Sequence, residues 1–192
     1  MEAFLISTGM VAIAEIGDKT QLLAIVLAAK FRKPVPIILG ILAATILNHA
    51  LAASLGYFIA QWLTGATFRI GVGLAFIAMA AWALVPDKED ERASSMSERG
   101  VFLTTLITFF LVEIGDKTQI ATSLLAARFQ NIAVVTLGTT AGMMLANAPA
   151  VLFGEAVTRI VPLNIVRMIA ASIFALIGLW IVIGTAVGTY AP

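Results

Sequence analysis

Six apolar stretches, separated by short polar breaks, dominate this sequence. They cover residues 4–29, 34–61, 68–86, 101–128, 132–159 and 163–188. A helix needs ~20 residues to cross the hydrocarbon core of a bilayer, which is about the length of each stretch. Transmembrane strands would instead alternate apolar and polar residues over ~10 positions. The pattern therefore predicts an all-α membrane protein with six transmembrane helices.

The composition excludes several other classes of protein. Hydrophobic residues make up 60% of the chain and charged residues 12%, whereas a soluble domain has ~45–50% and ~25%. With no cysteine there are no disulfides or thiolate metal sites, and a net charge of +1 gives no basic surface for nucleic acid. Because no positive segment precedes the first apolar stretch, we expect that stretch to be kept as a membrane helix in contact with lipid.

Basic residues outside the repeated motif described below are distributed unequally between the two sides that six crossings define. One side carries Lys30, Arg32, Lys33, Lys88, Arg92, Arg99, Arg159 and Arg167. The other side carries Arg69 and Arg128. Since cytoplasmic loops are enriched in Lys and Arg, we expect the first group in the cytoplasm and both termini on the other side.

The chain contains an internal repeat. The heptapeptide Glu-Ile-Gly-Asp-Lys-Thr-Gln occurs at 15–21 and again, identically, at 113–119. The same offset of 98 residues relates Gly40 to Gly138 and Gly56 to Gly154. The sequence predicts two three-helix repeats, 1–86 and 101–192, joined by a polar cytoplasmic linker at 87–100. Because three crossings are an odd number, the repeats should have inverted topology, with a site between them near the midplane.

The repeated heptapeptide places charged residues near the centre of the first and fourth apolar stretches. An acidic or basic residue there costs ~2.5–3.5 kcal/mol on translocon-insertion scales, so these side chains should face the protein interior or a water-filled cavity. Within each copy the Glu and Asp are three residues apart, which on a continuous helix places them on one face. Gly17 and Gly115 lie between them and are positions where the helix can open.

The acidic side chains of the two copies form the predicted metal site. We expect the carboxylates of Glu15, Asp18, Glu113 and Asp116 to converge if the repeats face each other. Oxygen ligands suit ions such as Mn²⁺ and Ca²⁺. Lys19 and Lys117 would balance part of the negative charge. Other polar residues are expected to support the site: Thr20, Gln21, Asn48, Thr118, Gln119 and Asn147.

A purely structural interpretation of the motif is also open. Glu15 could pair with Lys19, and Glu113 with Lys117, as buried ion pairs that only fix packing. That interpretation leaves Asp18 and Asp116 without an assigned role. His49, beside Asn48, is a candidate proton relay because histidine titrates near neutral pH, although a lone buried histidine is more often a packing residue.

Two copies of Glu-x-Gly-Asp-Lys-Thr in a small six-span protein with a central polar loop resemble the Gdt1 family, also called UPF0016. The resemblance covers the whole chain, and both copies, 15–20 and 113–118, fit the family pattern. It implies transport of Mn²⁺ or Ca²⁺ in exchange for H⁺, with the motif acids binding the metal. It also implies Mn²⁺ export across a bacterial inner membrane, without a prosthetic group.

Three other functions are alternatives that the same sequence features allow. An exporter of a small cationic solute, such as a basic amino acid, could use the acidic site. A cation channel is possible, although no ring-forming selectivity loop is visible in the sequence. A membrane enzyme could use the acids in general acid–base chemistry, but no nucleophile or cofactor motif accompanies them. We therefore predict a transporter and not an enzyme.

Overall fold

The structure, a computed structural model, describes residues 1–63, 65–85, 100–154 and 163–188. The helices are α1 (Glu2–Glu15), α2 (Lys19–Phe31), α3 (Pro34–Trp62), α4 (Ala66–Ala83), α5 (Val101–Glu113), α6 (Lys117–Phe129), α7 (Ile132–Phe153) and α9 (Leu163–Ala186). These described residues contain helices and turns and no strand. The all-helical part of the prediction is therefore confirmed. Residues 87–99 of the predicted linker at 87–100 lie outside the described residues.

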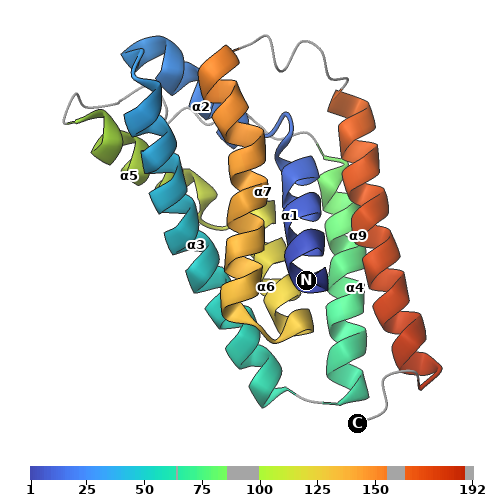
Figure 1. The fold of residues 1–192 in the computed structure, drawn as a ribbon. Coiled ribbons are helices and arrows are strands. Elements are labelled where there is room, and N and C mark those ends of the chain that lie inside the picture. The colour runs from blue at the N-terminus through green and yellow to red at the C-terminus, as the bar shows by residue number, and fades with distance from the viewer. Residues whose placement is uncertain (64, 86–99, 155–162, 189–192) are drawn as a thin grey trace.

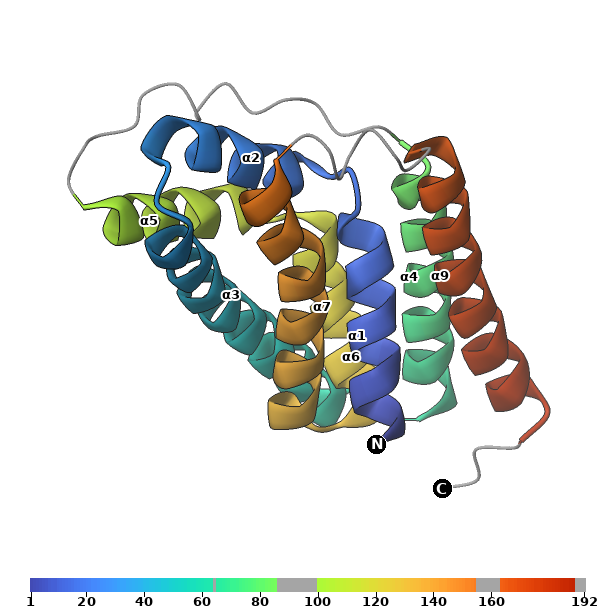
Figure 2. The ribbon, with the colours of Figure 1, turned by 45° about the horizontal axis from the view of Figure 1, so that its top comes forward.

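The helices form one bundle with two distinct ends (Figure 1). We call the end where α1 begins and α9 finishes the terminal end. The linker end is the opposite one, where α4 finishes and α5 begins. Figure 2 shows α2 and α5 lying across the linker end, while α3, α4, α7 and α9 run along the length of the bundle.

Four helices are long and apolar enough to cross a membrane: Pro34–Trp62, Ala66–Ala83, Ile132–Phe153 and Asn164–Ala186. They correspond to four of the six predicted spans. The other two predicted spans, 4–29 and 101–128, are not continuous helices, and each breaks at the glycine that the sequence marks as a position where the helix can open. Each of these stretches is two shorter helices, with a break at residues 16–18 or 114–116.

The two breaks have nearly the same backbone conformation. Gly17 and Gly115 have φ of 79° and 77°, in the region that glycine enters without the steric cost that a Cβ imposes. Asp18 and Asp116 follow in extended conformation, at φ −78°, ψ 166° and φ −77°, ψ 164°, and each is the N-cap of the next helix. The identical local sequence therefore produces the same helix–loop–helix unit twice.

Helices of each half of the chain pack against helices of the other half. α1 packs on α7, and α5 packs on α3. Gly40 allows the second contact, because a Cβ there would lie 2.8 Å from the Phe102 carbonyl oxygen. Gly138 does the same for the first, with a Cβ position 2.9 Å from the Phe4 carbonyl oxygen. The acidic residues of both motifs are buried in this packing.

Candidate metal-ion site

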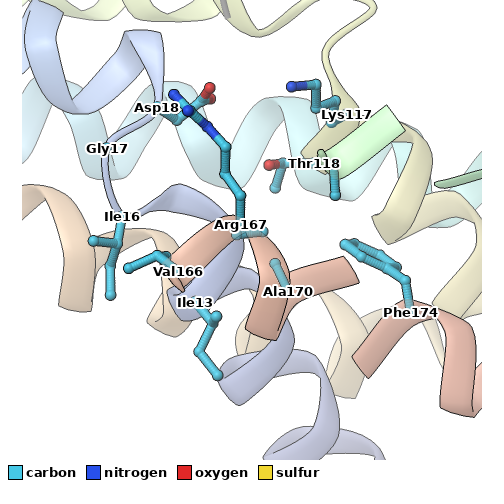
Figure 3. A pocket seen from close by; sticks show the side chains of 12 residues that line it. Ile13, Ile16, Gly17, Asp18, Lys117, Thr118, Val166, Arg167, Ala170 and Phe174 are labelled. Atoms are coloured by element: carbon cyan, nitrogen blue, oxygen red, sulfur yellow. The ribbon is translucent and has the colours of Figure 1, made fainter. Parts of the chain in front are cut away.

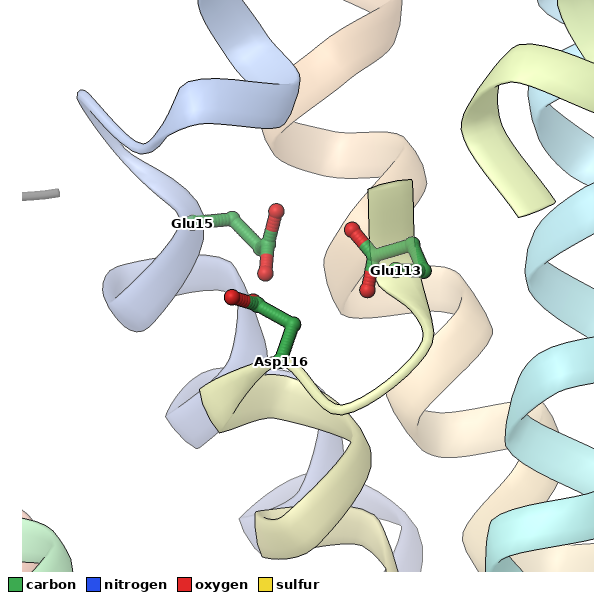
Figure 4. Close-up of side chains that lie close together, drawn as sticks. All are labelled: Glu15, Glu113 and Asp116. Atoms are coloured by element: carbon green, nitrogen blue, oxygen red, sulfur yellow. The ribbon is translucent and has the colours of Figure 1, made fainter. Parts of the chain in front are cut away.

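Three carboxylates meet at the two helix breaks (Figure 4). Glu15 is the last residue of α1, Glu113 is the last residue of α5, and Asp116 precedes α6. One oxygen from each lies within 4.8 Å of the others, and the residues are 0%, 0% and 4% exposed. Two halves of the chain thus contribute to one buried acidic cluster.

Glu15 is held by hydroxyl groups from both motifs. Thr20 Oγ1 donates a hydrogen bond to Glu15 Oε2 at 2.7 Å, and Thr118 Oγ1 donates one to Glu15 Oε1. The Asn147 side chain on α7 also interacts with this carboxylate. Because hydrogen bonds to an ionised carboxylate are stronger than those between neutral groups, these donors fix the orientation of Glu15.

Glu113 and Asp116 keep oxygens available for a ligand. Among the described residues, both Glu113 Oε atoms and Asp116 Oδ2 are buried and have no hydrogen-bond partner. Asp116 Oδ1 lies 2.9 Å from Lys19 Nζ. Three carboxylates and one ammonium give the cluster a formal charge of −2 when all are ionised, which one divalent cation would neutralise. Buried polar atoms without partners are unusual in proteins, and carboxylate oxygens are the ligands that hard divalent cations prefer.

The two glutamines of the motifs brace the breaks in equivalent ways. Gln21 Oε1 accepts a hydrogen bond from Gly17 N at 2.8 Å, and its Nε2 donates to the Ala146 carbonyl oxygen at 3.0 Å. Gln119 Oε1 accepts from Gly115 N at 2.7 Å, and its Nε2 lies 3.4 Å from Asn48 Oδ1. Positions 146 and 48 are themselves 98 residues apart, so the repeat extends to the contacts between halves.

Asp18 lies apart from the three clustered acids. It lines a cavity together with Lys117, Thr118 and Arg167, and Figure 3 shows their side chains around it. The expectation that the Glu and Asp of each motif share one helical face is wrong, because the helix ends at the Glu and a new one begins after the Asp. The structure therefore brings together three of the four predicted ligands.

The lysines also differ from the expected local pairs. Lys19 contacts Asp116 and donates a hydrogen bond to the Val112 carbonyl oxygen at 3.1 Å, across to the other half of the chain. Lys117 donates to the Val85 carbonyl oxygen at 3.0 Å. The ion pair Lys19–Asp116 is therefore a contact between halves, and not the Glu15–Lys19 pair of the packing interpretation.

The remaining predicted groups lie on α3 and α7. Asn48 and Asn147 are buried, and Asn48 Nδ2 donates a hydrogen bond to the Phe110 carbonyl oxygen at 3.1 Å. His49 is also fully buried, and among the described residues neither ring nitrogen has a hydrogen-bond partner. Sequence reasoning did not anticipate the backbone carbonyls of Val112 and Ala146 as partners, because nothing in a side-chain pattern marks a carbonyl contact.

Known proteins are similar to this chain over most of its length. The family described as "Divalent cation/proton antiporter GDT1" matches residues 3–91 and, separately, 101–188. A "Putative manganese exporter" of Vibrio cholerae is 48% identical over 180 residues, which is 93% of this chain and 90% of that protein.

More distant relatives carry the family name. "GDT1-like protein sll0615" of Synechocystis is 26% identical, covering 92% of this chain and 94% of that protein. "GDT1-like protein 4" of Oryza sativa subsp. indica is also 26% identical, covering 90% and 70%. No solved structure matches the chain. The helical bundle, the paired motifs and these matches together show that the chain is an integral membrane protein of the GDT1 family of cation transporters.

Proposed function

We propose that this protein exports Mn²⁺ in exchange for H⁺ through one site formed by the two motifs near the membrane midplane. The observation that carries the proposal is the buried cluster of Glu15, Glu113 and Asp116, in which one carboxylate oxygen of each residue lies within 4.8 Å of the others. Such a cluster is costly to bury without a cation, and it offers the ligands that Mn²⁺ and Ca²⁺ accept. Ca²⁺ is the second candidate ion.

Exchange follows from competition for the same oxygens. Ionised carboxylates bind the metal ion, and protonated carboxylates do not, so the site holds either the metal or protons. Thr20 and Thr118 orient Glu15 for this role, while Lys19 offsets part of the negative charge. Release of the metal on one side and loading of protons there would couple the two fluxes.

The proposal includes six membrane crossings arranged as two inverted repeats. The matching breaks, the matching glutamine contacts and the two separate family matches at 3–91 and 101–188 support it. In this arrangement α1 with α2 makes one crossing, and α5 with α6 makes another, each as a broken helix. Transporters commonly place their ion sites at such discontinuous helices between repeats.

The relatives and the charge distribution support the location that we propose. The similar protein from Vibrio cholerae favours a bacterial inner membrane. The end of α2 and the start of α3, with Arg32 and Lys33, lie at the linker end (Figure 2). The positive-inside rule would place that end in the cytoplasm and both termini outside.

Metal flux in proteoliposomes tests the proposal. Purified protein is reconstituted, and uptake of Mn²⁺, Ca²⁺ and Mg²⁺ is followed with imposed pH gradients of either sign. We expect Mn²⁺ to accumulate on the acidic side as protons leave it, inversion of the pH gradient to reverse the direction of the flux, and Glu113→Gln to abolish the flux. Flux independent of the pH gradient would indicate a channel, and transport of lysine or arginine in place of metal would indicate a cationic-solute exporter.

A further inference from the structure

The three clustered carboxylates do not fill the coordination shell of a divalent cation. Mn²⁺ and Ca²⁺ bound to proteins take about six or more oxygen ligands. Glu15, Glu113 and Asp116 each place one oxygen within 4.8 Å of the others, so further oxygens must come from water or from other protein groups. A neutral protein oxygen would serve here, because the carboxylates and Lys19 already give the cluster the charge that one such ion balances.

Four amide side chains were predicted to support the site, and their oxygens differ in what they contact. The oxygens of Gln21 and Gln119 accept hydrogen bonds from the backbone at the two glycine breaks. Asn48 Oδ1 lies 3.4 Å from Gln119 Nε2. Asn147 Oδ1 is buried and, among the described residues, has no hydrogen-bond partner. Of these four amide oxygens, that of Asn147 is therefore the one that remains available to a ligand.

Contacts of the Asn147 nitrogen fix the orientation of this amide. Its Nδ2 donates a hydrogen bond to the Met143 carbonyl oxygen at 3.1 Å and lies 2.9 Å from Met143 Sδ. A carbonyl oxygen only accepts hydrogen bonds, so the amide group beside it must be the NH₂ and not the oxygen. Met143 thus holds the nitrogen, and Oδ1 lies on the other side of the amide, where it can face an ion.

The packing of α7 along α1 brings Asn147 to the level of the carboxylate cluster. Both helices begin at the terminal end (Figure 1), and a Cβ at Gly142 would lie 2.8 Å from the Ala12 backbone nitrogen. One helical turn further along, α7 has residues 146–147 and α1 ends at Glu15. The Asn147 side chain interacts with the Glu15 carboxylate, and Figure 4 shows the pale orange ribbon of α7 passing behind the three acids. Its amide oxygen therefore lies beside the cluster.

Four oxygens in or beside the cluster accept hydrogen bonds and, among the described residues, have no donor: both Glu113 Oε atoms, Asp116 Oδ2 and Asn147 Oδ1. Buried acceptors without a donor are unfavourable, and a bound cation is one partner that could serve all four. We propose that Asn147 Oδ1 is a fourth protein ligand of the transported ion and that Met143 positions it. This proposal rests on the transport function proposed above. Amide oxygens are ordinary ligands of hard divalent cations.

The other half of the chain does not supply an equivalent ligand. The offset of 98 residues relates position 147 to position 49, which holds a histidine. Within the described part of the chain, the ionisable groups that come within 4.8 Å of one another are Glu15, Glu113 and Asp116, and no nitrogen of His49 is among them. In this proposal the ion is therefore coordinated asymmetrically, with its neutral protein ligand on α7.

Calorimetric titration of the purified full chain with Mn²⁺ tests the ligand. Asn147→Leu, which has a similar volume and no polar atom, should lower the affinity at least tenfold. Asn147→Asp loses the nitrogen donor but keeps an oxygen, and should bind within threefold of the native affinity or more tightly. A residue that acted only through its hydrogen bond to Met143 would lose affinity equally in both variants.

Thr139→Val is the matched control for these variants. Thr139 is also fully buried on α7, and its hydroxyl donates to the Val135 carbonyl oxygen of the same helix at 2.9 Å. The affinity of this variant should change less than threefold, and denaturant unfolding in detergent verifies that all three variants are folded. Equal losses in Asn147→Leu and Asn147→Asp, or native affinity in Asn147→Leu, would overturn the proposal.

Electron–nuclear double resonance of bound Mn²⁺ detects the ligand in the native chain, in which asparagine occurs at positions 48, 131, 147 and 164. In protein made with asparagine labelled with ¹³C at the side-chain carbonyl, we expect a ¹³C coupling to the metal. The coupling should disappear in Asn147→Asp and persist in Asn131→Asp, a change at the N-cap of α7. Bound Mn²⁺ without this coupling would overturn the ligand and leave the transport proposal standing, whereas native protein that neither binds nor transports Mn²⁺ would reject the transport proposal itself.

Discussion

At the scale of single residues, two aspartates with identical sequence neighbours have different surroundings in the fold. Asp116 belongs to the buried cluster with Glu15 and Glu113, and its Oδ1 contacts Lys19. Asp18 has the same neighbours in sequence and the same backbone conformation but lines the cavity near Lys117. In this conformation the two residues should contribute unequally to metal binding.

We therefore predict that Asp116→Asn weakens Mn²⁺ binding more than Asp18→Asn. Loss of one of three carboxylate ligands should lower the affinity at least tenfold, or about 1.4 kcal/mol, whereas Asp18→Asn should change it less than threefold. Isothermal titration calorimetry on purified protein measures both. Transport should fall with the affinity, and therefore more in Asp116→Asn than in Asp18→Asn. Equal losses of affinity would contradict the assignment of Asp116 alone to the cluster.

At the scale of elements, the helix breaks create the site. A continuous helix would satisfy its own backbone and leave the carboxylates on one stripe. The break at Gly115 instead turns the chain so that Glu113, at the end of α5, and Asp116, at the start of α6, both face Glu15. Gln119 then satisfies the amide of Gly115 that the helix no longer uses.

Gly115→Ala should lower both stability and metal affinity. A Cβ at this position would meet no atom within 4 Å, so the cost is conformational and comes from φ of +77°. Such strain costs ~1–3 kcal/mol. Gly9→Ala is the matched control, because Gly9 is inside α1 with open space around its Cβ position, and alanine should be neutral or stabilising there by up to ~1 kcal/mol. Denaturant unfolding in detergent compares them. Equal stability of the two variants would show that the positive φ is not required.

At the scale of the whole molecule, the halves are interleaved. The first helix of each half packs on a long helix of the other, as α1 does on α7 and α5 on α3. The small residues that permit these contacts, Gly40 and Gly138, occupy equivalent positions. An arrangement in which each half builds part of the other half's core makes the site depend on both repeats.

The proposed topology predicts opposite accessibility at the two ends. Lys33→Cys lies at the start of α3 at the linker end, and Ala66→Cys lies at the start of α4 at the terminal end, and both residues are exposed. In intact cells a membrane-impermeant maleimide should label Ala66→Cys and spare Lys33→Cys, which should react only after permeabilisation. The reverse pattern would place the termini in the cytoplasm and overturn the predicted orientation.

Sequence alone determined the helical class, the four long apolar helices and the family, because hydrophobic length and a doubled motif are local signals. It also marked Gly17 and Gly115 as weak points, since only glycine enters positive φ at little cost. It could not predict whether the helices break there. A continuous helix, with Glu15 and Asp18 on one face, fits the same sequence pattern. Only packing between the halves decided which carboxylates meet. The identical motifs have different surroundings, and so Asp116 joins the cluster while Asp18 lines the cavity.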